Sequence, residues 1–227
     1  MILHLIIPGM KTTSSSTNKI RTMFEENKKQ VEIFDYNSKG MFSNISRIAL
    51  NVSGMKKTSA RKQLVEYIKS FQNKNIHIHI YAHSHGALIL YRALTDMKKD
   101  NVVKVIKNIY TFGAASPIPY NTKNHILKNI NIINYYNDKD WMIGFIKHFG
   151  YEELFKNQTS MIQNIKIKGE NFKIQILNPI PINMTDPHSK SNEILQYQCS
   201  LKSKNAHKIP CYFTKMVELI ITENPDS

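Results

Sequence analysis

Cysteine is scarce in this chain: two residues, Cys199 and Cys211, stand among 227. Two cysteines are too few for a disulfide framework, and no Cys/His spacing of the zinc-finger type surrounds them. A chain of this length can bury about 70–75% of its unfolded surface. We therefore expect an unstapled hydrophobic core and a reducing compartment.

Long apolar runs are also missing. No run approaches the roughly 20 residues that would cross a bilayer. The opening MILHLIIPGMK lacks a basic leader, and its short apolar run stops at Pro8 and Gly9. This segment resembles a first strand more than a signal peptide. We expect a soluble, cytoplasmic protein.

Acidic residues are outnumbered, with 17 Asp and Glu against 31 Lys and Arg and a formal net charge of +14. Such an excess favours anionic partners, such as lipid headgroups or nucleic acid. The lysines are scattered, and no basic run is interleaved with aromatic residues as a nucleic-acid groove would require. We interpret most of the excess as compositional bias and expect no nucleic-acid partner. Peripheral attraction to an anionic membrane surface remains the partner that the charge predicts.

Strand-like and helix-like segments alternate, with no internal repeat or linker. This pattern predicts one α/β domain over residues 1–227, with a mostly parallel central sheet and helices on both faces. An antiparallel hairpin, inserted or at the sheet edge, is expected near residues 162–177, where two alternating runs flank a Gly-Glu-Asn turn. The expected strands are residues 3–7, 31–36, 76–81, 108–112 and 130–136; the expected helices are residues 18–29, 58–71, the run after Ser84, 189–201 and 213–221.

The run IHIHIYAHSHGALILYRAL, residues 76–94, passes from a strand pattern through a turn at Ser84 directly into a helix pattern. This is the layout of a nucleophile elbow, in which a sharp turn pushes a serine oxygen out of the sheet. The turn is strained and needs small neighbours, which Ala82 and Gly86 supply. Ser84 is therefore the predicted nucleophile.

A nucleophilic serine needs a base, an acid that holds the base, and donors for the oxyanion. In open α/β sheets these groups follow the carboxyl ends of strands. Asp138 and Asp140 come directly after the strand expected at residues 130–136. Asp140, followed by an aromatic and an apolar pair, is the preferred acid, and Asp138 is the alternative.

Three histidines remain as candidates for the base once those within or before the elbow and the acid strand are set aside. His188 is preferred because it lies in a proline-bounded loop just before a helix, and His148 and His207 are the alternatives. The predicted oxyanion donors are the backbone N–H of His85, which follows the nucleophile, and that of Met10.

Three motifs carry a family resemblance, and a later segment is similar to the family's histidine turn. AHSHGAL at residues 82–88, TFGAASP at 111–117, NYYNDKDWMI at 134–143 and PHS at 187–189 resemble segments of the α/β-hydrolase superfamily, particularly its class 3 lipase-like members. The resemblance implies a Ser84, Asp140 and His188 triad, cleavage of an acyl or lipid ester through an acyl-serine intermediate, and no metal or organic cofactor. Three features depart from the family's pattern: Ala82 replaces the first elbow glycine, His85 replaces the commoner apolar residue, and a hairpin is expected before the histidine.

Other functions compete with a serine esterase. A thioesterase or acyltransferase would use the same site. A non-catalytic protein could retain the fold as an interaction scaffold. His77, His79, His83 and His85 could also be interpreted as a metal cluster, but strand geometry separates the first two from the turn, so we expect structural histidines and no bound metal.

Overall fold

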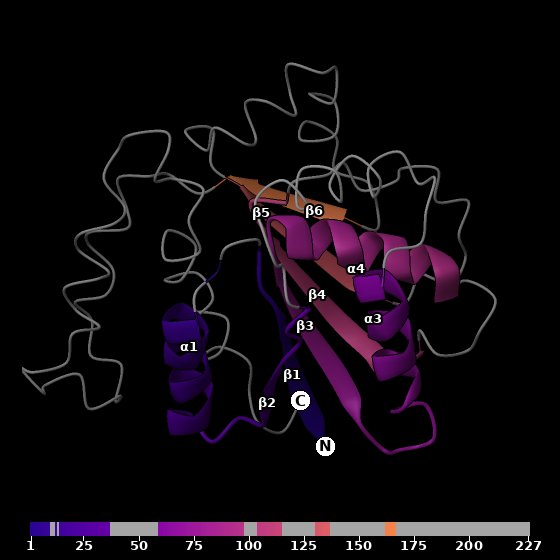
Figure 1. Cartoon of the computed structure of the whole chain (residues 1–227), viewed down its shortest axis with the longest axis horizontal. Coiled ribbons are helices and arrows are strands. Elements are labelled where there is room, and N and C mark those ends of the chain that lie inside the picture. Colours follow the sequence, from indigo (N-terminus) through magenta and orange to yellow (C-terminus); the bar gives the residue numbers. More distant parts are fainter. Residues whose placement is uncertain are drawn as a thin grey trace, which may run out of the picture.

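The computed structural model describes residues 1–9, 12, 14–36, 59–97, 104–114, 130–136 and 162–166. Its described strands form one sheet with helices packed beside it (Figure 1). The strands are β1 (Ile2–Ile7), β2 (Val31–Ile33), β3 (His77–His83), β4 (Ile106–Phe112), β5 (Asn131–Tyr136) and β6 (Ile162–Lys166), and the helices are α1 (Ser14–Glu26), α3 (Ser59–Lys69) and α4 (His85–Asp96).

The six strands lie in the order β2-β1-β3-β4-β5-β6, and every neighbouring pair is parallel. The predicted α/β class and parallel sheet are thus confirmed for this part of the chain. From β1 the chain moves outward to β2 and then back to β3 on the other side. The strand order therefore reverses between β1 and β3, which is where open α/β sheets form ligand sites.

One face of the sheet is apolar and packs against α3 and α4. Alternate residues of a strand point to opposite faces, so Leu3, Leu5 and Ile7 of β1 lie on the same face as Ile78, Ile80 and Ala82 of β3. All six are fully buried in one hydrophobic cluster with apolar residues of both helices. Packing on this face holds α4, the helix that follows Ser84, against the sheet.

The opposite face carries histidine and tyrosine and packs against α1. The ring of Phe24 lies 5.1 Å from that of His4 and 5.2 Å from that of Tyr81. His4 Nδ1 lies 3.1 Å from the Tyr81 hydroxyl, and the Asn108 amide lies 3.2 Å from His79 Nε2. Helices therefore cover both faces, as predicted, and His79 is a hydrogen-bonded core residue.

The bounds of α1 and β2 differ from the prediction by three or four residues. The helix α1 begins at Ser14, four residues before the expected residue 18. Residues 14–17, which lie before the expected start, form the first turn of this helix. The strand β2 ends at Ile33, short of residue 36. Phe34 N–H still donates to the Ile6 carbonyl at 2.8 Å.

The hairpin expected near residues 162–177 falls only partly within the described residues, which here are residues 162–166 alone. Ile162–Lys166 pairs in parallel with β5, from Ile132 with Ile162 to Tyr136 with Lys166, and is the last strand of the sheet within the described residues. An alternating pattern fixes which side chains share a face but carries no information on strand direction. Residues 167–177, and the helices expected at residues 189–201 and 213–221, lie outside the described residues.

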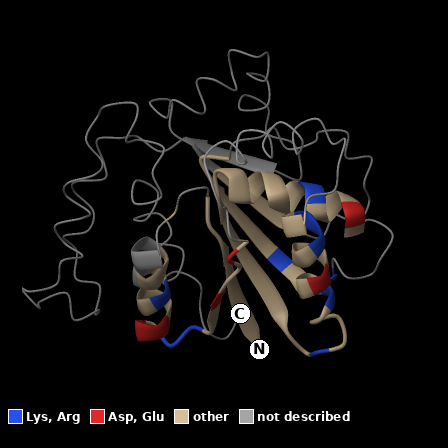
Figure 2. Ribbon diagram, in the orientation of Figure 1, with Lys and Arg blue, Asp and Glu red and all other residues tan. Residues whose placement is uncertain are grey.

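Charged residues of both signs lie on the helices in Figure 2, while most of the sheet is uncharged. The helix α3 shows this mixture in its sequence, SARKQLVEYIK. Within the described ranges, no helix is both long and apolar enough to cross a membrane.

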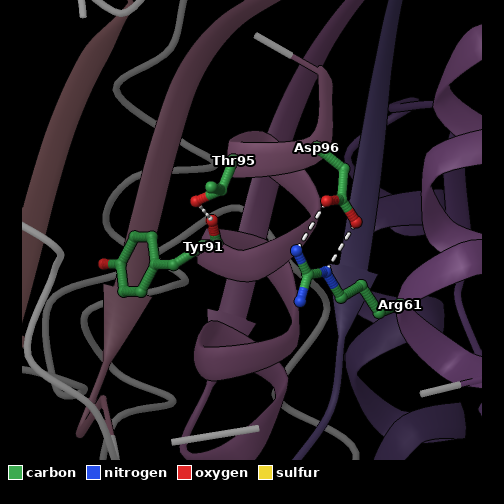
Figure 3. A network of polar contacts seen from close by, with 4 residues as sticks. All are labelled: Arg61, Tyr91, Thr95 and Asp96. Carbon is green, nitrogen blue, oxygen red and sulfur yellow. Dashed lines mark hydrogen bonds and ion pairs between the residues drawn. The ribbon is translucent and has the colours of Figure 1, made fainter. Parts of the chain in front are cut away.

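A buried ion pair joins α3 to the end of α4 (Figure 3). Arg61 donates from Nε and from Nη2 to the two carboxylate oxygens of Asp96, each at 2.6 Å, and the two side chains are 7% and 14% exposed. Burial and the nearby charge of Arg61 lower the pKa of Arg92. Asp96 therefore compensates a region where two cations lie close together.

Removing the carboxylate charge should destabilise the fold strongly. We expect Asp96→Asn to lower the free energy of unfolding by about 3 kcal/mol, because Arg61 would remain buried without its counterion. Urea unfolding measures the loss. The double variant Arg61→Met with Asp96→Leu should recover most of it; a loss under about 0.5 kcal/mol in Asp96→Asn would contradict the assigned role.

Candidate active site

Ser84 is the single residue between β3 and α4, and its backbone is strained. Its φ of 52° and ψ of −122° lie in a region that non-glycine residues rarely occupy. In the described ranges only Lys28 shares a positive φ among non-glycine residues. The strained turn predicted from the sequence is therefore present at Ser84.

Hydrogen bonds hold this turn on both sides. Ser84 N–H donates to the Phe112 carbonyl of β4 at 3.0 Å, and Ala87 N–H in the first turn of α4 donates to the Ser84 carbonyl at 3.1 Å. Ser84 is 5% exposed. The surrounding sheet and helix thus fix a conformation that would be unfavourable in an isolated peptide.

Two glycines allow the elbow to contact the loop that follows β1. A Cβ atom added at Gly86 would lie 2.4 Å from the carbonyl oxygen of Ile7 and 2.6 Å from that of Pro8. A Cβ atom added at Gly9 would lie 3.0 Å from Ser84 Cβ and 2.7 Å from His83 Nδ1. The loop after β1 therefore lies in close contact with the Ser84 turn.

Tyr36 joins this contact from the segment after β2. Its hydroxyl donates to the Pro8 carbonyl at 2.8 Å and lies 3.5 Å from His85 Nδ1. Burial, and secondarily the neighbouring Asp35 carboxylate, raises the pKa of Tyr36 well above its ordinary value. Its position beyond a strand at the carboxyl edge was the signal in the sequence, and our sequence analysis missed it.

The Gly9 carbonyl has its own partner, because the Thr12 hydroxyl donates to it at 2.9 Å.

His85 is the first residue of α4, so its backbone N–H lies at the positive end of the helix dipole. A partial positive charge there would favour an anionic group beside Ser84.

A buried polar chain connects α4 to β5. The Tyr91 hydroxyl donates to Thr111 Oγ1 at 3.1 Å, and the Thr111 hydroxyl donates to Asn134 Oδ1 at 2.8 Å. Thr111 opens the TFGAASP motif and Asn134 opens the NYYNDKDWMI motif, so these two segments are in direct contact. Both side chains are buried, at 0% and 3% exposure.

Of the site residues predicted from the sequence, the structure describes Ser84 and His85. The other predicted site residues lie outside the described residues: Met10, Asp138, Asp140, His148, His188 and His207. The strand β5 ends at Tyr136, two residues before Asp138, at the same edge of the sheet as Ser84.

The histidines near the elbow do not gather into one metal-binding group. Across the described ranges, no three His, Cys, Asp or Glu side chains lie together as metal ligands would. His79 bonds to Asn108, while His85 lies beside Tyr36. These two rings have partners in different parts of the fold.

Comparison with known proteins gives one family. The model of the family described as "Protein of unknown function (DUF726)" matches residues 27–177, about two thirds of the chain. The chain belongs to the DUF726 family. No curated protein and no solved structure matches it. The part that matches the DUF726 model includes Ser84, Tyr36 and both candidate aspartates, and it begins after the Gly9 loop.

The backbone strain at Ser84 can be measured by comparing two variants that both lack the hydroxyl. We expect Ser84→Gly to be more stable than Ser84→Ala by about 1 kcal/mol, because glycine tolerates a φ of 52°. Urea denaturation of the two proteins gives the difference. Equal stability, or a more stable alanine variant, would mean that the turn stores no strain.

Proposed function

We propose that this DUF726 protein is a serine hydrolase of the α/β-hydrolase type that cleaves a carboxylic ester, acyl or lipid, with Ser84 as nucleophile. The observation that carries the proposal is the strained Ser84 turn with the Gly9 loop held against it. A strained residue costs about 1–3 kcal/mol and persists where its surroundings impose it, most often at functional sites. A purely structural serine gains nothing from that cost.

The reaction would proceed in two steps. Ser84 Oγ forms a bond to the ester carbonyl carbon while a histidine takes its proton. The carbon bond to the alcohol oxygen then breaks, and the histidine returns the proton to the leaving alcohol. Water, activated by the same histidine, hydrolyses the acyl-serine. The N–H groups of His85 and Met10 would stabilise both oxyanions.

Strand directions support the proposed acid. Parallel strands bring their carboxyl ends to one edge of the sheet, and β5 lies two strands from β3, about 10 Å away. The strand β5 ends at that edge with Tyr136, and Asp138 and Asp140 follow it in the sequence. A loop of a few residues is long enough to bring either carboxylate behind the base.

The direction of β6 supports the proposed base. Because β6 is parallel to β5, its last residue, Lys166, lies at the same edge as Ser84. His188 and His207 follow β6, whereas His148 lies in the connection between β5 and β6 and is the one of the three within the family match. We propose His188 as base, and His148 and His207 remain the alternatives.

Loss of the nucleophile gives the first test. We expect Ser84→Ala to abolish hydrolysis of short p-nitrophenyl esters and labelling by a fluorophosphonate probe, while circular dichroism stays unchanged. Ser70→Ala is the matched control, since Ser70 is exposed and its hydroxyl donates to the Tyr67 carbonyl at the end of α3. Wild-type turnover in Ser84→Ala would exclude the assignment, and an unlabelled wild-type Ser84 would indicate a scaffold.

The base can be identified by comparing three histidine variants. We expect His188→Ala to lower kcat/KM by at least about 10³-fold, with His148→Ala and His207→Ala near wild type. Wild-type kcat/KM should fall as pH drops through about 6.5, because a protonated imidazole cannot accept the serine proton. A loss confined to His148→Ala or His207→Ala would transfer the role of base to that residue.

A further inference from the structure

The peptide between Pro8 and Gly9 lies beside the proposed nucleophile but beyond the end of β1. The strand ends at Ile7, so the strand ladder no longer sets the direction of the Pro8 carbonyl. Loop peptides without a fixed partner can rotate, and rotation here would move the backbone N–H groups near Ser84. A separate interaction must therefore fix this peptide if it serves catalysis.

The Tyr36 hydroxyl supplies that interaction. It lies 2.8 Å from the Pro8 carbonyl oxygen, a good distance for a hydrogen bond. A trans peptide is planar, with its N–H pointing away from its carbonyl. Fixing the Pro8 carbonyl therefore also fixes the direction of the Gly9 N–H. Gly86 closes the other side, since a Cβ there would lie 2.6 Å from the same oxygen.

The hydroxyl has one proton, and a carbonyl oxygen can only accept. The proton therefore points to Pro8, and the Tyr36 oxygen is left to accept from His85 Nδ1, at the longer distance of 3.5 Å. The Tyr36 and His85 rings are also in edge contact, with centroids 5.9 Å apart. One side chain thus touches both His85 and the Pro8–Gly9 peptide, which lie beside Ser84.

The Tyr36 hydroxyl stays protonated, and so remains a hydrogen-bond donor, over the pH range in which a hydrolase is assayed. Burial and the Asp35 carboxylate raise the pKa of Tyr36, so the hydroxyl keeps its proton even in alkaline assays. No loss of this hydrogen bond is expected between neutral and mildly alkaline pH.

We propose that Tyr36 is a positioning residue for the oxyanion hole, holding the Pro8–Gly9 peptide and His85 in place around Ser84. The inference rests on the proposed hydrolase function, because an oxyanion hole has a role only if Ser84 reacts. A misplaced donor reduces the stabilisation of the transition state more than it reduces the binding of the substrate. The effect should therefore appear in kcat and leave KM almost unchanged.

Tyr36→Phe removes the hydroxyl and keeps the ring. We expect kcat for p-nitrophenyl butyrate to fall about 10- to 100-fold, less than the 10²–10³-fold typical when a donor itself is lost, with KM within about twofold. The rate of fluorophosphonate labelling should fall in parallel. The final extent of labelling should match wild type, because it measures the fraction of folded protein. The labelling rate depends on how well the oxyanion donors are positioned around Ser84.

Tyr67→Phe is the matched control. Tyr67 of α3 is also a partly buried tyrosine, and its ring contacts that of Phe34. Its hydroxyl, however, donates to Glu32 of β2 and not to the loop beside Ser84. We expect wild-type kcat in this variant. If Tyr36→Phe does not fold, Thr12→Val tests the same loop, because the Thr12 hydroxyl holds the next carbonyl, that of Gly9, and its loss should also lower kcat selectively.

The outcomes separate this inference from the proposed function. If Ser84 is labelled and essential but both Tyr36→Phe and Thr12→Val keep kcat within about twofold of wild type, the positioning role is wrong and the hydrolase stands. An equal loss of kcat in Tyr67→Phe would also overturn the role. If Ser84 is neither labelled nor needed, the hydrolase function fails, and the positioning role fails with it.

Discussion

Two backbone segments touch where β1 and β3 end, and they can do so only because residues 9 and 86 have no side chain. A Cβ at Gly86 would enter the van der Waals radius of two carbonyl oxygens, and one at Gly9 would press on Ser84. The turn at Ser84, the start of α4 and the course of the loop after β1 all depend on this contact. A side chain at either position would push the nucleophile and the loop apart.

The two faces of the sheet differ in composition, and both are packed against helices that hold this contact in place. The apolar face packs against α3 and α4, and so ties the helix after Ser84 to the strand before it. The opposite face is held by aromatic and histidine contacts with α1. The Arg61 and Asp96 pair fixes the far end of α4, while the Tyr91, Thr111 and Asn134 chain fixes α4 to β4 and β5. The strain at Ser84 is supported from several directions.

Local patterns predicted most of the described elements. The strands β1, β3, β4 and β5 and the helix α3 lie within about two residues of their expected positions, because continuous apolar runs and a helical stripe report burial directly. The Ser84 turn was predicted because small residues at 82 and 86 are a local requirement of its geometry. The direction of β6 was not, since strand pairing depends on a partner distant in the sequence.

Membership of the DUF726 family places the chain among relatives without assigning it a reaction. By itself, the sequence determined where strands give way to helices and which serine occupies a sharp turn, because those features depend on neighbours a few residues apart. Only the tertiary structure decided that Tyr36 reaches Pro8, 28 residues away in the chain, and that Gly9 lies against Ser84. The physical reason is that parallel pairing of β2, β1 and β3 brings the ends of three separate segments to one edge, and no local pattern encodes that meeting.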